Sequence, residues 1–124
     1  MSVWKCIHLY ADADALSMID PNHVVELSTQ NFAPPATPML VARAARATAL
    51  AFLELPVGWR GGWHPSPSEQ WVICLAGMMG YEAGDGSTFT LRAGSYILTT
   101  DTNGRGHNSW NAGPDPVQLA VIGI

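Results

Sequence analysis

Two histidines and one glutamine are the side chains of this protein best suited to chemistry. His64 lies in the segment GWHPSPSEQW (62–71), which also contains Gln70, and His107 follows further along the chain. Neutral imidazoles bind Fe, Mn, Ni, Cu and Zn, and the amide oxygen of Gln70 can act as a weaker ligand. Histidine also titrates near neutral pH. The three residues therefore predict either a divalent metal site or a histidine pair that divides the roles of general base and acid.

The elements that must position these residues are short β-strands. Alternating or apolar runs recur at close spacing and are separated by turns rich in Gly, Pro and Asp, of which AGDGS (83–87) is a strong hairpin signal. Residues 31–38 are Pro-rich and are expected to be extended on the surface, and residues 38–46 extended or irregular. This pattern predicts an all-β sandwich or barrel. The expected strands are 47–55, 71–77, 78–83, 88–92, 95–100, 107–110 and 117–124.

The strand that follows His64 has two apolar faces. Gln70, Val72 and Cys74 share one face by parity, whereas Trp71 and Ile73 share the other. A strand that is apolar on both sides should be covered on both sides. We therefore expect the first face to line the interior and the second to be covered by another layer or by a second subunit, which favours a homodimer.

Composition limits the function classes. The chain has 124 residues, 48% of them hydrophobic and 13% charged, as expected for one compact domain. Its six Lys and Arg residues and net charge of −4 argue against nucleic-acid binding, and no apolar run has the length of a membrane span. The acidic N-terminal segment does not resemble a signal peptide. Cys6 and Cys74 are expected to be free thiols, which favours a cytoplasmic protein.

The spacing around His64 resembles the first motif of the cupin superfamily. That motif is Gly, five residues, His-x-His, three or four residues, Glu, six residues, Gly. In this chain Gly58, His64, Ser66, Gln70 and Gly77 occupy the named positions. Two of the family's four usual metal ligands are therefore changed, with Ser66 at the second histidine and Gln70 at the glutamate.

The second cupin motif is matched by the segment around His107. It reads Gly, five to seven residues, Pro-x-Gly, two residues, His, three residues, Asn. Gly94, Thr102, Gly104, His107 and Asn111 stand at these positions, with Thr102 in place of the proline. The resemblance implies a single-domain jelly-roll barrel, a homodimer and a bacterial source. Residues 1–38 would form an N-terminal strand and extended arm, and residues 47–124 the barrel with its motifs at 58–77 and 94–111.

The changed ligands leave two interpretations of the site equally open. In the first, His64, Gln70 and His107 hold a divalent transition metal, with positions left for water or substrate. Glu69 could supply a carboxylate only if the two prolines shift the strand register. In the second, the protein is metal-free and the two histidines form a polar pair inside the barrel, which could still exchange protons with a substrate.

The same fold implies a mostly apolar cavity for a small organic molecule. Parity and proximity to the motifs place Ser66, Val72 and Cys74 at the cavity, and Trp63 and Tyr96 are its candidate aromatic walls. Arg105 could recognise a carboxylate at the rim. His8 and His23 have no expected role in the site; His8 is expected in a strand and His23 in a turn or on the surface.

These observations favour a small-molecule enzyme. Proton-transfer or Lewis-acid chemistry of the isomerase, lyase or cyclase type is preferred over dioxygenation. A non-catalytic module that binds or senses a small molecule is the alternative. The third possibility is a protein that only associates with other proteins and whose barrel is filled by its own side chains.

Overall fold

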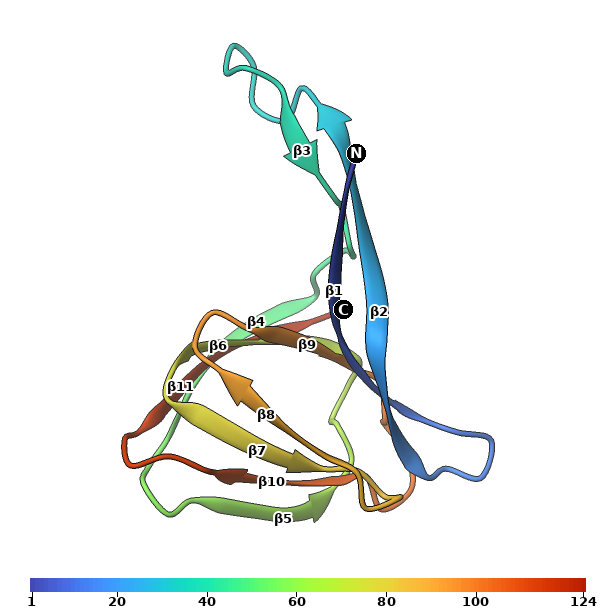
Figure 1. Cartoon of the computed structure of the whole chain (residues 1–124), viewed down its shortest axis with the longest axis vertical. Helices are drawn as coiled ribbons and strands as arrows, with labels where there is room; N and C mark the ends of the chain where they lie inside the picture. The colour runs from blue at the N-terminus through green and yellow to red at the C-terminus, as the bar shows by residue number, and fades with distance from the viewer.

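Eleven β-strands in two sheets make up the computed structural model, which describes residues 1–124 (Figure 1). The all-β prediction is confirmed. No helix in the chain is long and apolar enough to cross a membrane. The strands are β1 (Ser2–Ala11), β2 (Ser17–Gln30), β3 (Met39–Val41), β4 (Ala49–Leu55), β5 (Arg60–His64), β6 (Gln70–Ala76), β7 (Met78–Glu82), β8 (Thr88–Arg92), β9 (Tyr96–Thr99), β10 (His107–Asn111) and β11 (Val117–Gly123).

The larger sheet has seven strands in the order β3-β2-β1-β9-β6-β11-β4, and the smaller has four in the order β5-β10-β7-β8. The two sheets face each other around the barrel interior (Figure 1). The N-terminal part of β1, most of β2 and β3 project beyond it, and we call residues 24–44 of this projection the arm. All pairings between the strands are antiparallel except that of β1 with β9. The core between the sheets includes Leu9, Val72, Met79, Leu91, Ile97 and Val117.

Local sequence accounts for the hairpin between β7 and β8. The main-chain N–H of Ala83 donates to the carbonyl of Ser87 (2.8 Å), and Asp85 Oδ1 accepts from the Ser87 N–H (2.9 Å). Gly86 has a φ of +88°, a conformation that glycine adopts without steric cost. The AGDGS segment therefore forms the predicted turn.

The strands expected from residue 71 onward match β6 to β11 closely, and the 47–55 strand corresponds to β4. Three strands, β2, β3 and β5, were not expected; β3 lies in residues 38–46, which were expected to be extended or irregular. The sequence DPN (20–22) near the start of β2 is typical of a turn, which hides the strand. The prediction that His23 lies in a turn is wrong, because His23 is a half-buried residue within β2. Strand β5 contains Gly61 and Gly62, which weaken a strand pattern.

The alternation of side chains along β6 places one face toward the core and the other on the outside of the large sheet, as predicted. Val72 and Cys74 are buried toward the core, whereas Trp71 and Ile73 line a groove on the outer face of the large sheet. The arm supplies the opposite wall of this groove through side chains that include Phe32. The arm of the same chain thus covers part of the outer face. Cys6 and Cys74 are both buried and free, as expected.

Candidate active site

A cavity of about 430 Å³ lies inside the barrel. Most of its wall is apolar. Its polar side chains come from β5 and β10 (His64, His107, Ser109), from β6 and β9 (Gln70, Thr99) and from the segment after β5 (Ser66). His64, Ser66, Gln70, Val72 and His107 all line it, together with Tyr81. The barrel is therefore not filled by its own side chains, and the polar residues singled out from the sequence share one space.

His64 and His107 face each other across two antiparallel strands. They form a register pair between β5 and β10, and their ring centroids lie 4.8 Å apart. Nδ1 of His64 donates to the carbonyl oxygen of Gly62 (2.8 Å), which leaves Nε2 of this half-buried imidazole free. Strand pairing thus brings together two residues 43 positions apart in the sequence.

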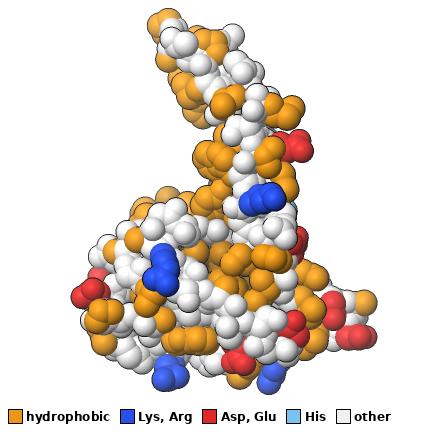
Figure 2. Space-filling view, in the orientation of Figure 1, with side chains coloured by type: hydrophobic (Ala, Val, Ile, Leu, Met, Phe, Trp, Pro, Cys, Tyr) orange, Lys and Arg blue, Asp and Glu red, His pale blue; other side chains and the backbone are white.

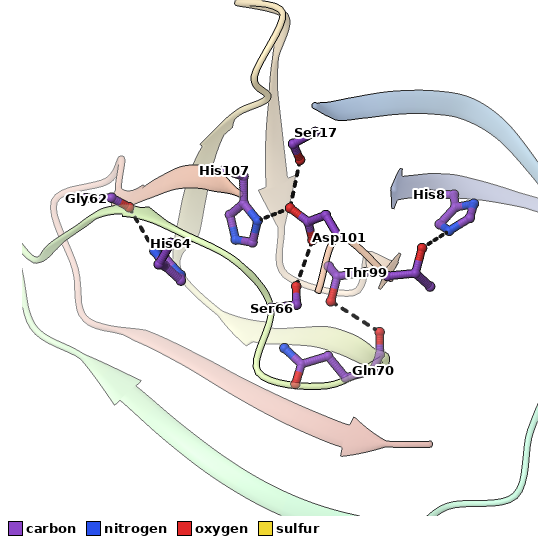
Figure 3. A network of polar contacts seen from close by, with 10 residues as sticks. His8, Ser17, Gly62, His64, Ser66, Gln70, Thr99, Asp101 and His107 are labelled. Carbon is purple, nitrogen blue, oxygen red and sulfur yellow. Dashed lines mark hydrogen bonds and ion pairs between the residues drawn. The ribbon is translucent and has the colours of Figure 1, made fainter. Parts of the chain in front are cut away.

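Asp101 is the principal site residue that the sequence analysis missed. It is fully buried, and its Oδ2 accepts a hydrogen bond from Nδ1 of His107 (2.6 Å), itself 5% exposed. Ser17 Oγ donates to the same oxygen (2.7 Å), and Ser66 Oγ donates to Oδ1 (2.8 Å). Figure 3 shows the three donors arranged around the carboxylate. The one available sequence signal was a lone carboxylate within the second motif, in the loop just before His107.

The network fixes the charge on Asp101. Burial by itself raises the pKa of the Asp101 carboxyl group. This effect is outweighed by the hydrogen bond and charge of His107 and by the hydrogen bonds from Ser17 and Ser66, which all lower the pKa. The pKa of Asp101 is consequently lowered. Since an ionised carboxylate only accepts hydrogen bonds, Nδ1 of His107 carries the proton, and Nε2 bears the lone pair when the ring is neutral.

Ser66 links the HPSP segment to Asp101 twice. Besides the side-chain bond, the Ser66 N–H donates to the main-chain carbonyl of Asp101 (3.0 Å). The close approach of the segment after β5 to the segment before β10 also depends on Gly106. This residue has a φ of +75°, and a Cβ atom at its position would clash with the carbonyl of His64. The residue at the position of the family's second histidine therefore serves to hold the buried carboxylate.

Tyr81 adds a second polar group close to His107. It is buried on β7, its ring centroid lies 5.8 Å from that of His107, and burial raises its pKa well above the ordinary tyrosine value. The phenol is therefore a neutral O–H donor at neutral pH.

Four residues expected near the pocket do not line this cavity. Arg105 is exposed, and its guanidinium stacks on the ring of Trp63 at 3.7 Å from the centroid. Tyr96 lies on the outer face of the large sheet, where it lines the groove under the arm. Cys74 is fully buried, and its thiol donates to the carbonyl of Ala76 (3.5 Å). For Tyr96, proximity in sequence was misleading because neighbouring residues in a strand point to opposite faces.

The cavity does not reproduce the family's four-ligand metal set. It offers two imidazole nitrogens and the side-chain amide of Gln70. The hydroxyl of Thr99 donates to the main-chain oxygen of Gln70 (3.5 Å), not to this amide. Glu69 is exposed and does not line the cavity, while Asp101 and Ser66 are engaged with each other. The cavity wall therefore offers neither a carboxylate nor a third imidazole as a metal ligand.

Residues 51–123 match the Cupin domain family. The match covers more than half of the chain and contains both motifs, so this protein belongs to the cupin family, and its fold is the cupin jelly-roll. Among curated proteins, no sequence matches the chain.

Two solved structures illustrate what the chain is similar to. One is protein NMB1881 from Neisseria meningitidis, with a TM-score of 0.43 and 19% identity over 59% of this chain and 69% of the other. The other is the conserved SPY1581 protein of unknown function from Streptococcus pyogenes, with a TM-score of 0.47 and 24% identity over 68% and 70% of the two chains. The family assignment rests on the sequence match to residues 51–123.

Proposed function

We propose that this cupin is a small-molecule enzyme that transfers protons inside its barrel, with His107 as general base. The observation that carries the proposal is the hydrogen bond from His107 Nδ1 to the buried Asp101 carboxylate. It directs the lone pair of Nε2 away from Asp101, and the negative charge stabilises the imidazolium that forms when Nε2 takes a proton. The cavity is the space in which a substrate would meet this nitrogen.

An isomerase or lyase reaction suits these groups. Nε2 of His107 removes a proton from a carbon next to a carbonyl, and the electron pair of the broken C–H bond moves toward the carbonyl oxygen. The Tyr81 hydroxyl donates a hydrogen bond to that oxygen and stabilises the enolate, and His64 in its imidazolium form would donate a second one from Nε2. Gln70 orients a polar group through its amide. His107 then returns its proton to a neighbouring carbon, or the enolate re-forms the carbonyl and expels a leaving group from the next carbon, which takes the proton from His107.

The substrate class follows from the size and lining of the cavity. A volume of about 430 Å³ with a mainly apolar wall suits a small organic molecule that carries one or two polar groups. The polar groups would face His64, Gln70 and His107, and the apolar part would pack on the side chains of Val72, Met79 and Leu119.

A divalent metal at His64, Gln70 and His107 is the second candidate. The observation that favours it is that Nδ1 of both histidines bonds to an oxygen acceptor, an arrangement common in metal-bound histidines. A bound Fe, Mn, Ni, Cu or Zn ion would supply Lewis-acid chemistry, and iron or copper would also allow dioxygenase chemistry. Elemental analysis of protein purified without chelators, alongside His107→Ala, separates the two candidates.

The experiment for proton transfer uses solvent deuterium. The purified protein is incubated in D₂O with a panel of small keto acids, hydroxy acids and cyclic ketones, and NMR follows the exchange of protons next to the carbonyl. Exchange by the native protein that is lost in His107→Ala and reduced in His64→Ala supports the proposal. Exchange that survives both substitutions contradicts it, and a ligand that binds tightly and is recovered unexchanged identifies a non-catalytic binding module.

A homodimer formed through the outer face belongs to the same proposal. Phe32, Met39 and Leu40 on the arm are 40–51% exposed, and Figure 2 shows hydrophobic side chains along the arm. Symmetric packing of a second copy on the groove of about 470 Å³ under the arm would cover these side chains. Sedimentation analysis should give a dimer for the native protein and a monomer for Leu40→Glu. The two free, buried thiols support a cytoplasmic location.

A further inference from the structure

Three side chains with metal-binding atoms meet outside the barrel, at the pairing of β1 with β2. They are His8 on β1 and Asp20 and His23 on β2, and one ligand atom from each lies within 4.8 Å of the others. All three are half-buried. None of them lines the barrel cavity, so this cluster is separate from the candidate active site.

The strand register explains why the three side chains converge. His8 is directly opposite Asp20, whereas His23 is opposite Cys6, and the pairing is interrupted between Cys6 and His8 by a bulge. A bulge re-aims the side chains beside it. The rings of His8 and His23 lie 5.1 Å apart, although one residue of β1 separates His8 from Cys6 and two residues of β2 separate His23 from Asp20.

We propose that His8, Asp20 and His23 form a binding site for a divalent transition-metal ion, of which Zn²⁺ suits the donors best. Two imidazole nitrogens and one carboxylate are a common ligand set for zinc, with the fourth position open to water or another ligand. A hard ion such as Mg²⁺ or Ca²⁺ would instead require more oxygen ligands. The cluster therefore selects a borderline metal.

Neighbouring groups already orient two of the three ligands. Nε2 of His8 is hydrogen-bonded to Thr100 Oγ1 (2.7 Å), which fixes the ring and leaves Nδ1 for a metal. Asp20 Oδ1 accepts from the main-chain N–H of Asn22 (2.9 Å), which leaves Oδ2 without a partner. Such outer contacts are typical of metal sites because they fix the orientation of the ligands.

The aromatic surroundings limit how the site can move. The ring of His8 lies 5.5 Å from that of Tyr10, and the ring of His23 lies 6.2 Å from that of Trp71, which belongs to β6 in the middle of the large sheet. A metal held here would join β1 to β2 at the base of the arm. It would therefore stabilise the connection between the arm and the barrel.

The test measures Zn²⁺ binding in a chain whose barrel histidines are absent. In the His64→Ala/His107→Ala variant, isothermal titration calorimetry should show one equivalent of Zn²⁺. Adding His23→Ala should weaken the affinity by at least about 100-fold, since losing a ligand costs more than the 10–100-fold typical of an outer contact. Adding Thr100→Val should weaken it by about 10-fold. Co²⁺ should give the absorption bands of a low-coordinate ion.

Glu26→Gln is the matched control, because Glu26 is an acid on the same strand outside the cluster, and it should leave Zn²⁺ affinity unchanged. Circular dichroism verifies folding. If the double variant does not fold, the native chain and His23→Ala are compared, and the native chain should bind one more equivalent. Equal Zn²⁺ stoichiometry and affinity with and without His23 would overturn the assignment, whatever the barrel binds.

Discussion

Nδ1 of His107 and Oδ2 of Asp101 lie 2.6 Å apart, and both side chains are buried. A short hydrogen bond between a buried carboxylate and an imidazole sets which ring nitrogen is free. In this cupin the free nitrogen is Nε2. The position of Asp101 therefore matters to the proposed chemistry as much as the histidine itself.

Asp101→Asn should change the protonation of the His107 ring. The asparagine amide cannot carry the negative charge that holds the proton on Nδ1, so protonated Nε2 should become populated. The ¹⁵N chemical shifts of the two ring nitrogens report this directly. Asp85→Asn, in the β7–β8 turn, is the control and should leave them unchanged. Identical His107 shifts in the native protein and in Asp101→Asn would disprove the assigned role of Asp101.

The lowered pKa of Asp101 predicts a specific loss of stability in acid. In the unfolded chain the carboxyl titrates near its ordinary pKa of about 3.9. Its folded-state pKa is lower. The unfolded state therefore binds the proton more readily, so the stabilisation is complete above the ordinary pKa and is lost as pH falls through the folded-state pKa.

Urea unfolding between about pH 6 and pH 2 measures this contribution. The free energy of unfolding of the native protein should fall more steeply below about pH 4 than that of Asp101→Asn, which lacks the titrating group. Parallel curves for the two proteins would mean that the carboxylate is not stabilised in the folded state.

Ser66→Ala should destabilise the protein although the substitution removes only one oxygen atom. The hydroxyl donates to Asp101 Oδ1, and its loss leaves a buried carboxylate with one fewer donor. The expected cost is about 1–3 kcal/mol in the free energy of unfolding. Ser68→Ala, in the same segment but exposed, should change stability by less than about 0.5 kcal/mol. Equal effects of the two substitutions in urea unfolding would contradict the role of Ser66.

Gly106→Ala should be far more disruptive than Gly86→Ala. Both glycines have positive φ, +75° and +88°, so both substitutions carry a similar backbone cost of about 1–2 kcal/mol. At Gly86 the added Cβ meets open space, whereas at Gly106 it meets the carbonyl of His64. Thermal unfolding should show a modest decrease in Tm for Gly86→Ala and a much larger one for Gly106→Ala. Similar decreases would show that the loops can separate without cost.

The sequence was sufficient to predict the barrel because its strands carry strong local signals. Residues 71–76 have two apolar faces, and the AGDGS turn fixes the hairpin that follows. The spacing of the two cupin motifs was also sufficient to predict that His64 and His107 lie close together, and the structure pairs them on neighbouring strands. Strand β2 was missed because Asp20, Pro21 and Asn22 resemble a turn when only local preference is considered.

The role of Asp101 could not be predicted because it depends on contacts between distant segments. Ser17 and Asp101 are 84 residues apart, and Ser66 and Asp101 are 35 apart. No periodicity in the sequence indicates which hydroxyl groups will meet a carboxylate after folding. The convergence of His8, Asp20 and His23 likewise depends on a bulge that has no clear sequence signal.

The hydrogen bond from Ser17 to Asp101 connects the N-terminal part of the chain to the region that matches the cupin family. The cupin family match begins at residue 51, yet one of the three side-chain donors that hold the buried carboxylate comes from the first residue of β2. A chain shortened to the matched region would keep both barrel histidines but would lose this donor, together with β1, β2 and β3 of the large sheet. The hydrogen-bond network around the buried carboxylate therefore extends beyond the region that matches the family, because Ser17 lies before residue 51.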